Sequence, residues 1–467
     1  MPKKHYDVII IGSGPGGIFA AMEILKNNEK TNILILEKGN QIDKRRCPRI
    51  DNCLNCRSCG ITSGWGGAGA FSDGKLTYAP EVGGWLSEII GAQKLTELYK
   101  KVDSDWMSFA SQDDNTFYDQ GDEDLKARCQ KAGIHLIDEK VRHLGTDRCL
   151  EILTNMYDFL VKYPTVEILH RANVEKIITD ERNNKVVRGV EFTYKKENLT
   201  AFSPIVVAAP GRAGSEWLQG EMERLNIPMK VNPVDIGVRV ETNAVWADAL
   251  TKNVYEPKMV YYTDKFDDKV RTFCVNPRGE VVTESYGDVI TVNGHSNFNS
   301  KTQNTNFALL VSTVFTEPFK EPSKYGKHVA RLANLIGGGA IVQRLGDLKK
   351  GRRSTPERIA KGLVKPTLNA TPGDLSFVLP YRHLHNIVEM LDKMNEVAPG
   401  VGSKDTLLYG VEVKFYSSRP ALDDNFETPV KGLYAIGDGA GVTRGLSQAS
   451  VNGIIVGQAI VQKLTLS

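Results

Sequence analysis

The sequence lacks the features of several protein classes. No apolar run reaches the about 20 residues that a helix needs to cross a bilayer, so no membrane span is expected. Charge of one sign is not in excess: 59 basic and 56 acidic residues leave a net charge of +3, too little to indicate a nucleic-acid partner. The 467 residues, 41% of them hydrophobic, suffice for roughly two or three globular domains.

Cysteine is also scarce, with seven residues, and four of them lie between positions 47 and 59. This crowding favours a metal or redox role in a reducing compartment over a disulfide framework. Lys3 and Lys4 precede an apolar run, as in a signal peptide, but glycines interrupt the run at once and no cleavage-type site follows. We therefore expect a first strand of the fold here, and a cytoplasmic protein.

A glycine motif near the N-terminus predicts a dinucleotide-binding unit. The apolar run 7–11 is typical of a buried parallel strand. Gly12 permits the tight turn, Gly14 lets the backbone approach a pyrophosphate, and Gly17 lets the next helix pack closely. That helix, expected over 16–27, would hold the phosphates at its N-terminus. The candidate cofactor contacts are Gly12, Ser13, Gly14, Pro15, Gly16 and Gly17.

An acidic residue follows the second strand of this unit. The run 33–36 predicts the strand, and Glu37 ends it, with Lys38 next in a turn. A carboxylate at this point can accept both hydroxyls of an adenosine ribose and disfavours a 2′-phosphate. Glu37 and Lys38 are therefore added to the candidate cofactor contacts, and NADP is not expected at this site.

The crowded cysteines have the spacing C-x5-C-x2-C-x2-C, from Cys47 through Cys53 and Cys56 to Cys59. Thiolates so spaced can converge on one ion, and part of the pattern resembles iron–sulfur ligand runs. The flanking basic residues favour thiolates. An iron–sulfur cluster, a structural zinc, a redox-active thiol pair and a loop of unliganded cysteines all stay open.

A second glycine-rich stretch follows over 63–76. Its glycines indicate a backbone that approaches another group closely, and the flavin end of FAD is the natural object. A flexible linker is the alternative, but Trp65 and Phe71 are large aromatics of a kind that exposed linkers seldom carry. The candidate contacts in this stretch are Gly66, Gly67, Ala68, Phe71 and Ser72.

The middle of the chain has a helical pattern first and strand patterns after it. Residues 85–165 have the three- and four-residue spacing of helices. From 165 strands return, first a parallel strand and then a hairpin, and a helix capped by Ser215 is expected after the strand near 205. In dinucleotide folds the position of Val174 packs against adenine, so Val174 is a candidate for backbone contacts. Ala209 and Gly211, at the end of the strand near 205, are further candidate cofactor contacts.

Between about 222 and 405 short strands recur, and 234–241 alternates apolar and polar residues, which predicts a half-buried antiparallel strand. Helices are expected over 325–335 and 383–394. The basic run 349–353 is expected to be a solvated loop. We interpret this part as an antiparallel sheet with helices on one face.

The C-terminal stretch returns to strand, glycine turn and helix, and is expected to complete the first domain. Asp438 is placed to accept a ribityl hydroxyl of FAD. The helix N-terminus near Gln448 would lie by the flavin pyrimidine edge, where its dipole favours negative charge on the reduced flavin. Gly437 and Ala449 are further candidate cofactor contacts.

These patterns predict an α/β fold, with a Rossmann-like FAD-binding domain and an antiparallel-sheet α+β substrate domain. The expected boundaries are 1–84, 166–221 and 406–467 for the FAD-binding domain, 85–165 for a mainly helical insertion, and 222–405 for the substrate domain.

The motifs at 12–17 with Glu37, at 207–211 and at 434–438 together resemble those of the large FAD-dependent oxidoreductases of the glutathione-reductase-like type. Three more stretches, 66–76, 271–274 and 343–347, resemble a group of poorly characterised FAD-dependent dehydrogenases, over nearly the whole chain. The resemblance implies FAD and a redox role but supplies no substrate. In that group the sequence after Phe-Cys continues with a second cysteine, whereas here Val275 follows Cys274.

No second G-x-G-x-x-G unit occurs, so no dedicated nicotinamide domain is expected. Electrons would come from transient NAD(P)H, from a protein electron donor, or through a cysteine-bound cluster. The first expectation is an FAD-dependent dehydrogenase or reductase that moves a hydride or an electron pair to or from a small organic substrate. The catalytic candidates beside the flavin-type motifs are Lys75, Cys274, His295 and Arg444.

Two alternatives belong to other classes. A flavoprotein that acts on RNA would use the basic cysteine loop and the run 349–353, but the low net charge speaks against it. A non-catalytic flavin or metal protein would be an electron carrier or a sensor, but the size of the second domain speaks against it.

Overall fold

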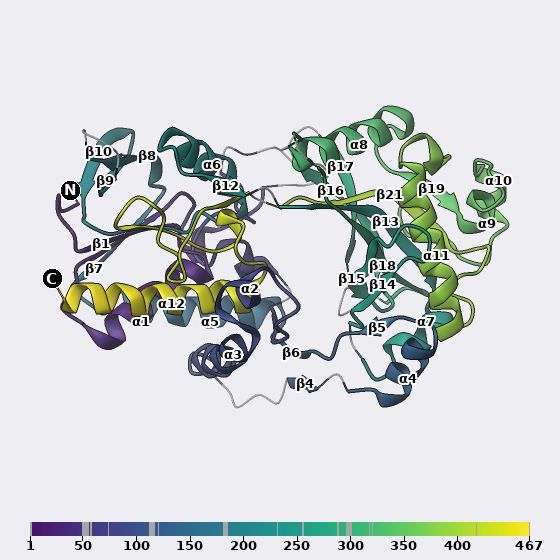
Figure 1. The fold of residues 1–467 in the computed structure, drawn as a ribbon, viewed down its shortest axis with the longest axis horizontal. Coiled ribbons are helices and arrows are strands. Elements are labelled where there is room, and N and C mark those ends of the chain that lie inside the picture. The colour runs from purple at the N-terminus through teal and green to yellow at the C-terminus, as the bar shows by residue number, and fades with distance from the viewer. Residues whose placement is uncertain are drawn as a thin grey trace. The chain divides into compact units, whose positions relative to one another are not determined.

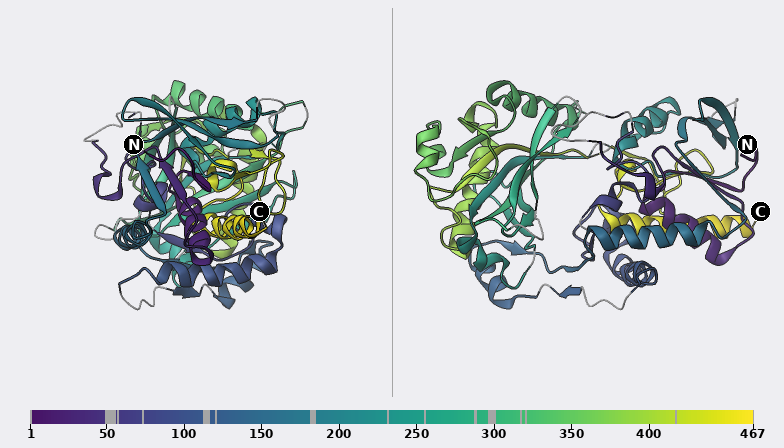
Figure 2. Two further views of the ribbon diagram at one scale, coloured as in Figure 1. Left: turned by 90° about the vertical axis from the view of Figure 1, so that its left-hand side faces the viewer. Right: turned by 180° about the vertical axis from the view of Figure 1, so that it is seen from behind.

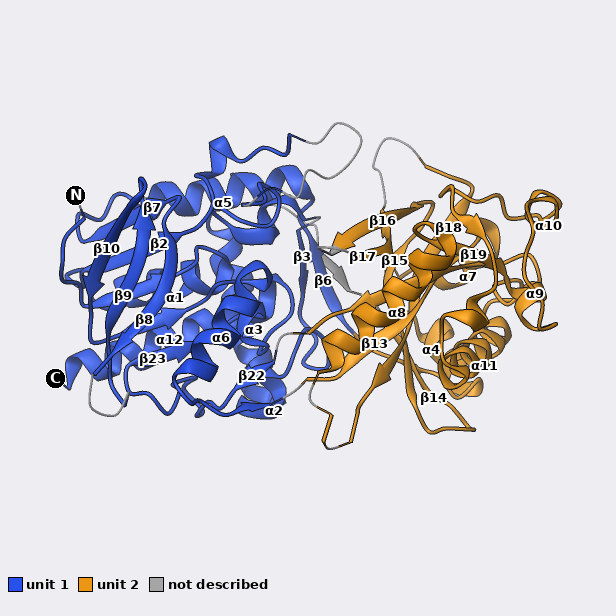
Figure 3. Cartoon of the chain, turned by 90° about the horizontal axis from the view of Figure 1, so that it is seen from above, with its two compact units in different colours: residues 1–119, 139–231, 417–467 blue, residues 120–138, 232–416 orange. Residues whose placement is uncertain are grey.

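The computed structural model describes residues 2–48, 56, 58–72, 74–111, 117–119, 121–180, 185–230, 232–254, 256–286, 289–295, 301–316, 318–319, 321–416 and 418–466. Figures 1 and 2 show the course of the chain. It forms two compact units: unit 1 comprises 1–119, 139–231 and 417–467, and unit 2 comprises 120–138 and 232–416 (Figure 3). Each unit has its own hydrophobic core.

A five-stranded parallel sheet in the order β23-β11-β1-β2-β7 lies at the centre of unit 1. Its strands are β1 (Val8–Ile11), β2 (Ile33–Glu37), β7 (Val166–His170), β11 (Val206–Ala208) and β23 (Leu433–Ala435). Four of them are buried throughout, as apolar strands covered on both faces are. β23, near the end of the chain, pairs in parallel with β11, so the C-terminal stretch is part of this sheet.

The helices of unit 1 are α1 (Pro15–Asn27), α2 (Leu86–Ile90), α3 (Ala92–Met107), α5 (Thr146–Leu160), α6 (Ser215–Arg224) and α12 (Leu446–Thr465). α1 and α12 lie side by side (Figures 1 and 2), and small residues make this possible. A Cβ atom at Gly453 would overlap the carbonyl oxygen of Gly16, and one at Gly457 would press on Glu23. The helix that ends the chain is therefore fixed against the helix that begins it.

Three small sheets complete unit 1. They are β8 (Asn173–Thr179) with β9 (Val187–Tyr194) and β10 (Glu197–Phe202), β3 (Lys75–Thr77) with β4 (Phe117–Asp119) and β6 (Lys140–His143), and β12 (Met229–Lys230) with β22 (Arg419–Pro420). The predicted cap of α6 is wrong. A 3₁₀ turn over Arg212–Gly214 leads into the helix, so Gly214 is the N-cap, and the Ser215 hydroxyl donates to the Arg212 carbonyl at 2.9 Å.

Unit 2 is built on an eight-stranded sheet in the order β20-β19-β21-β13-β18-β15-β14-β5, with a hairpin of β16 and β17. The strands are β5 (His135–Leu136), β13 (Val234–Asn243), β14 (Met259–Tyr262), β15 (Lys269–Asn276), β16 (Glu280–Tyr286), β17 (Val289–His295), β18 (Asn304–Thr313), β19 (Ile341–Arg344), β20 (Thr371–Pro372) and β21 (Leu407–Lys414). The helices are α4 (Glu123–Lys131), α7 (Ala244–Thr251), α8 (Pro322–Gly337), α9 (Leu345–Leu348), α10 (Pro356–Ala360) and α11 (Tyr381–Val397).

The prediction for 234–241 is wrong in one respect. The segment is an antiparallel strand, but it is buried on both faces rather than half-buried. Its polar side chains, such as Arg239 and Glu241, lie inside unit 2 because other chain segments cover them: Gly294 of β17 lies so close to Arg239 that a Cβ atom there would overlap the guanidinium.

The predicted fold class, a parallel α/β sheet with an antiparallel-sheet unit, is confirmed. Among the described residues, no helix combines the length and the apolar character that a membrane span requires.

Candidate functional site

The three glycines of the N-terminal turn differ in what surrounds them. Gly12 has a φ of +97°, and a Cβ atom there would overlap the carbonyl oxygen of Ala209. A Cβ atom at Gly17 would overlap the carbonyl oxygen of Gly12, so α1 packs directly on the turn. Gly14, by contrast, has no heavy atom within 4 Å of its Cβ position. The turn is therefore closed at its two ends and open in the middle.

The glycine-rich stretch after the cysteines folds back onto this turn. The Gly66 amide donates to the Ser13 carbonyl at 2.8 Å, and a Cβ atom at Gly67 would lie 3.2 Å from the Gly14 Cα atom. Gly66 and Gly67 have φ values of +81° and +59°, which favour glycine. Within the stretch, Ser72 turns inward and donates to the Gly69 carbonyl at 2.8 Å, while Ala68 is exposed.

The beginning of α12 borders the same turn. A Cβ atom at Gly16 would lie 3.4 Å from the Ala449 carbonyl oxygen. Six further described glycines of unit 1 resemble Gly14 in having no heavy atom within 4 Å of their Cβ positions: Gly91, Gly145, Gly211, Gly220, Gly437 and Gly445. Three of these, Gly211, Gly437 and Gly445, lie after strands of the parallel sheet or directly before α12. We call Gly14, Gly211, Gly437 and Gly445 the open glycines. They follow β1, β11 and β23 or precede α12, so they lie at the carboxyl ends of parallel strands and at a helix start, where α/β folds bind ligands.

Polar groups at the start of α12 lack partners. The hydroxyl of Ser447 and the amide nitrogen of Asn452 are buried and have no hydrogen-bond partner among the described residues. The first turn of α12 contains no acidic side chain, and no side chain caps it. A helix N-terminus with unsatisfied donors attracts an anion or a carbonyl oxygen.

Asp438, the predicted ribityl contact, makes three hydrogen bonds within unit 1. Its carboxylate accepts from the Thr443 hydroxyl at 2.9 Å, from Arg212 Nε at 3.0 Å and from the Gly445 amide at 3.4 Å. Gln448 donates to the Val82 carbonyl at 2.8 Å. The cofactor contacts of Asp438 and Gln448 stay predictions.

Glu37 is bound by the chain itself. One carboxylate oxygen accepts from the Ser13 amide at 2.9 Å and from the Ser13 hydroxyl at 2.7 Å. The other accepts from the amides of Gly39 and Gly64, at 2.7 and 2.8 Å. A carboxylate has roughly four lone-pair sites. A ribose hydroxyl could therefore bind Glu37 only by sharing or replacing one of these hydrogen bonds.

Next to Glu37 lies a histidine that sequence reasoning missed. His170 of β7 is the cross-strand neighbour of Glu37, and neither of its ring nitrogens has a partner among the described residues. Its ring lies 5.7 Å from that of Tyr157 and 6.4 Å from that of Trp65. Burial lowers the pKa of His170, so the neutral form is favoured. No spacing in the sequence marks this residue, because its neighbours come from distant segments.

Arg45 ties the cysteine segment to the glycine-rich stretch. The side chain is buried and donates to four backbone carbonyl groups at 2.5 to 3.0 Å, those of Gly60, Ile61, Trp65 and Gly67. Its guanidinium carbon lies 4.8 Å from the ring centroid of Phe71. Burial lowers the pKa of Arg45 to about 10, which leaves it charged at neutral pH.

The candidate metal ligands are only partly described. Burial raises the pKa of the Cys59 thiol, but the amides of Thr62 and Ile61 and the charge of Arg45 lower it more, so the net pKa lies below its usual value. Cys47 and Cys56 are exposed, and Cys53 lies outside the described residues. Within the part of the chain that the structure describes, no three His, Cys, Asp or Glu residues form a group that could hold a metal ion.

The four catalytic candidates divide between the units. Lys75 lies in β3 and Arg444 directly before α12, both in unit 1. Cys274 lies in β15 and His295 ends β17, both in unit 2. Of the remaining cofactor candidates, Val174 is buried in β8, Pro15 is the first residue of α1, and Lys38 is exposed.

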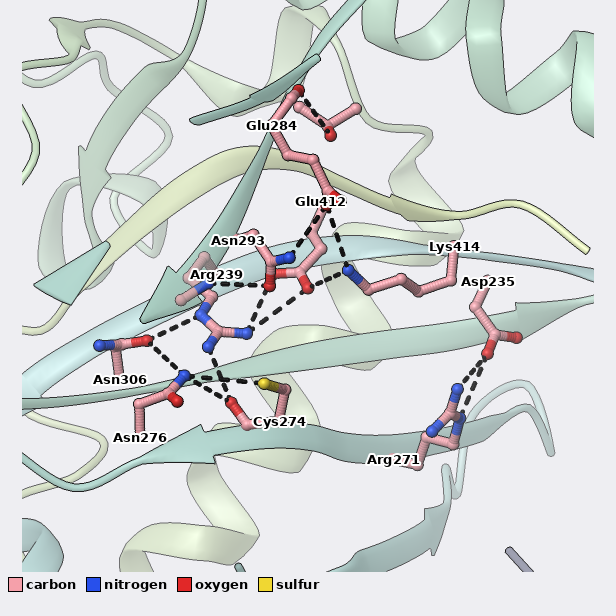
Figure 4. Close-up of polar contacts among 12 residues, drawn as sticks. Asp235, Arg239, Arg271, Cys274, Asn276, Glu284, Asn293, Asn306, Glu412 and Lys414 are labelled. Carbon is pink, nitrogen blue, oxygen red and sulfur yellow. Dashed lines mark hydrogen bonds and ion pairs between the residues drawn. The ribbon is translucent and has the colours of Figure 1, made fainter. Parts of the chain in front are cut away.

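Cys274 belongs to a buried polar cluster in unit 2, which Figure 4 shows. Arg239, with none of its side chain exposed, donates to the Cys274 carbonyl at 2.7 Å and to Asn306 at 2.9 Å, and lies 3.4 Å from Glu412. Lys414 lies 3.0 Å from Glu412. Cys274 has a φ of +46°, and the pairing of β15 with β18 is irregular at this point. The cluster therefore fixes a backbone irregularity through paired charges.

Comparison with known proteins bears on both units. Residues 233–415, within unit 2, match a family model described as FAD-dependent protein, C-terminal domain-like. The match covers less than half of the chain, and it supports, at that coarse level, the predicted FAD-dependent class.

Two curated proteins are similar to this chain, one over nearly its whole length and one over a short segment. An uncharacterized protein of Clostridium beijerinckii is 28% identical over 486 residues, which cover 98% of this chain and 81% of that protein. The sarcosine oxidase subunit beta of an Arthrobacter species is 50% identical over only 38 residues, 8% of this chain and 9% of that protein.

Among solved structures, a formate oxidase is 11% identical with a TM-score of 0.49, covering 100% of this chain and 99% of its own. A quinol fumarate reductase of E. coli is 14% identical with a TM-score of 0.42, covering 100% of this chain and 71% of its own. At these identities and TM-scores, neither structure bears on the substrate or partners of this chain.

Proposed function

We propose that this chain is an FAD-dependent oxidoreductase that moves a hydride or an electron pair between FAD held in unit 1 and a small organic substrate. The observation that carries the proposal is the set of open glycines, two of which, Gly14 and Gly445, are the N-cap residues of α1 and α12. Side chains at these positions would occupy space that the chain leaves unfilled. The family match of unit 2 supports FAD as the group that fills it.

The residues of unit 1 suit the parts of FAD in order. The start of α1, with the bare backbone of Gly14, would receive the pyrophosphate. Glu37 would bind the adenosine ribose and Asp438 the ribityl chain. Gln448 and Ala449, at the start of α12, would lie along the flavin pyrimidine edge, where the helix dipole stabilises negative charge. When bound, FAD supplies the centre that accepts and returns the electron pair.

The proposal leaves three alternative sources of the electrons. Transient NAD(P)H, a protein donor, and a cluster on Cys47, Cys53, Cys56 and Cys59 would each serve. Arg45 supports a link between the cysteine segment and the cofactor site, because it hydrogen-bonds both the Gly60 and the Gly67 carbonyls.

The test is an absorbance spectrum of protein purified without oxygen, before and after dithionite, with the released flavin identified and iron and zinc assayed on the same sample. We expect flavin bands that bleach on reduction, and FAD as the released flavin at about one per chain. A protein that holds no flavin and acquires none on incubation with FAD would contradict the proposal. Several irons per chain with a broad bleachable shoulder would select the cluster as the electron route, and their absence would eliminate it.

A further inference from the structure

One arginine of unit 1 is buried without a hydrogen-bond partner at one of its nitrogens. Arg419 begins β22, where its backbone pairs with that of Lys230 in β12. Its side chain is only 9% exposed, and Nη1 is fully buried with no hydrogen-bond partner among the described residues. Buried polar groups are nearly always satisfied, and a buried donor without an acceptor lowers stability. A partner that is not part of the chain is the simplest physical explanation.

The groups around Arg419 indicate what kind of molecule the missing partner is. Its guanidinium carbon lies 5.9 Å from the ring centroid of Trp85, and that of Arg444 lies 4.3 Å from the same ring. An indole attracts cations through its π-face but offers no hydrogen-bond acceptor to them. A planar anion with two oxygens fits a guanidinium fork best, and a carboxylate forms two parallel hydrogen bonds with it.

The position of Trp85 links this cluster to the open glycines. The Trp85 amide donates to the Val442 carbonyl at 3.0 Å, and Gly84 pairs with Thr443. The Thr443 hydroxyl in turn donates to Asp438 at 2.9 Å, next to Gly437. Backbone contacts at Gly84 and Trp85 therefore connect the Trp85 segment to the edge where the flavin end of FAD is expected.

We propose that Arg419 and Arg444, whose guanidinium groups both lie near the indole ring of Trp85, form a subsite for a carboxylate. The substrate of the enzyme would then be a small organic acid. That the bound acid is a substrate rests on the proposed function, whereas the anion site itself rests on the burial and contacts of Arg419. The FAD phosphates are a poor alternative occupant, because the start of α1 and Gly14 provide for them.

Binding is measured by tryptophan fluorescence of the purified full chain, titrated with succinate, with succinamide as the uncharged analogue and with inorganic phosphate. The Trp85→Phe variant identifies the part of the signal that comes from Trp85. Arg419→Gln removes the charge, and Arg419→Lys keeps the charge but loses the fork. Lys230→Gln is the matched control, since it removes an exposed charge from the residue paired with Arg419.

We expect saturable quenching by succinate that is absent in Trp85→Phe, absent with succinamide, and weaker with phosphate. Arg419→Gln should weaken succinate binding at least about tenfold, Arg419→Lys by an intermediate factor, and Lys230→Gln less than about twofold. The melting temperature of Arg419→Gln should equal or exceed that of the wild type, because no internal hydrogen bond is lost at Nη1.

Three results would overturn the subsite: no saturable succinate signal from the wild type, equal binding by Arg419→Gln, or a large loss of melting temperature in Arg419→Gln, which would make Arg419 structural. Binding of phosphate without succinate would also overturn it. FAD content, measured on the same samples, separates the two proposals. Protein with FAD but no succinate binding refutes only the subsite, and protein with succinate binding but no FAD refutes only the proposed function.

Discussion

Two buried arginines show how differently the two units use charge. Arg239 of unit 2 is fully buried, and its guanidinium hydrogen-bonds Asn306 and the Cys274 carbonyl and pairs with Glu412. Arg419 of unit 1 is almost as buried, yet its Nη1 has no partner among the described residues. The first arrangement is complete without a ligand and is that of a structural cluster. The second is complete only with one.

The glycines repeat this contrast. Gly294 of unit 2 is a glycine because Arg239 occupies the place of a side chain. Gly14 of unit 1 has nothing within 4 Å of that place. A glycine forced by internal packing indicates structure, whereas a glycine that borders unfilled space at the carboxyl end of a parallel strand leaves room for another molecule.

The largest effect should come from Arg239. Replacing it by Met would leave Glu412 with Lys414 alone and would strip the Cys274 carbonyl of a donor. We expect a loss of about 3–5 kcal/mol in the free energy of unfolding, measured by urea titration of circular dichroism. Arg419→Gln, measured alongside, should change it by less than about 1 kcal/mol. Equal losses in the two variants would remove the distinction between the clusters.

The next effect concerns pH and His383 of α11. Burial lowers the pKa of His383 to about 4, and its Nε2 atom lies 2.9 Å from the Thr313 hydroxyl. The folded state disfavours the charged ring, so this stability is present above the unfolded pKa of about 6.5 and is lost as pH falls toward 4. Between these limits the loss should approach about 3 kcal/mol.

Other carboxyl groups begin to titrate near pH 4, whereas Asp268, whose pKa the Arg382 side chain lowers, stays charged across this window. The measurement is therefore the difference in unfolding free energy between the wild type and His383→Gln, which keeps a partner for Thr313. The difference should change steadily from pH 6.5 to pH 4. A constant difference would show that His383 does not titrate there.

A smaller effect separates the two kinds of glycine. Gly294→Ala would press a methyl group into the Arg239 guanidinium and should cost about 1–3 kcal/mol. Gly14→Ala should stay within about 0.5 kcal/mol of the wild type, because the φ of −75° suits any residue and the added methyl meets nothing. Thermal unfolding of the two variants checks the pair, and a reversed order would contradict the assignment of Gly14 to ligand space.

The smallest effect is spectroscopic. His170 of unit 1 lies beside Glu37, whereas His383 lies in unit 2. If FAD binds by Glu37, it should shift the NMR resonances and the pKa of His170 and leave those of His383 unchanged. Identical spectra for His170 with and without bound FAD would place the cofactor elsewhere.

Local patterns carried most of what the sequence predicted correctly. The spacing of nearby residues predicts the turn at Gly12, Gly14 and Gly17 and the strands on either side of α1. It also predicts the strand β23 near the end of the chain. The predicted alternation of 234–241 was a poor guide to burial, because it records only which residues face the strand's two sides and not what covers them. The Ser215 cap failed because a preceding 3₁₀ turn moved the helix start.

Long-range pairings could not be predicted in this way. Arg45 looked like one of several basic residues that flank cysteines, but it reaches carbonyl groups as far along the chain as Gly67. Arg419 and Trp85 come from opposite ends of unit 1's sequence, and so do Arg239 and Glu412 in unit 2. Only the folded chain distinguishes Arg239, whose three nitrogens all have partners, from Arg419, whose Nη1 atom has none among the described residues.

The central claim is that the open glycines of unit 1 hold FAD, and one titration tests it most directly. Flavin-free protein is titrated with FAD, and Gly14→Val is compared with Gly220→Val, whose glycine in α6 also has nothing within 4 Å of its Cβ position. We predict that Gly14→Val folds but binds FAD at least about tenfold more weakly, a difference of ~1.4 kcal/mol or more, while Gly220→Val binds as the wild type does. Equal FAD affinity in Gly14→Val and the wild type would contradict the claim.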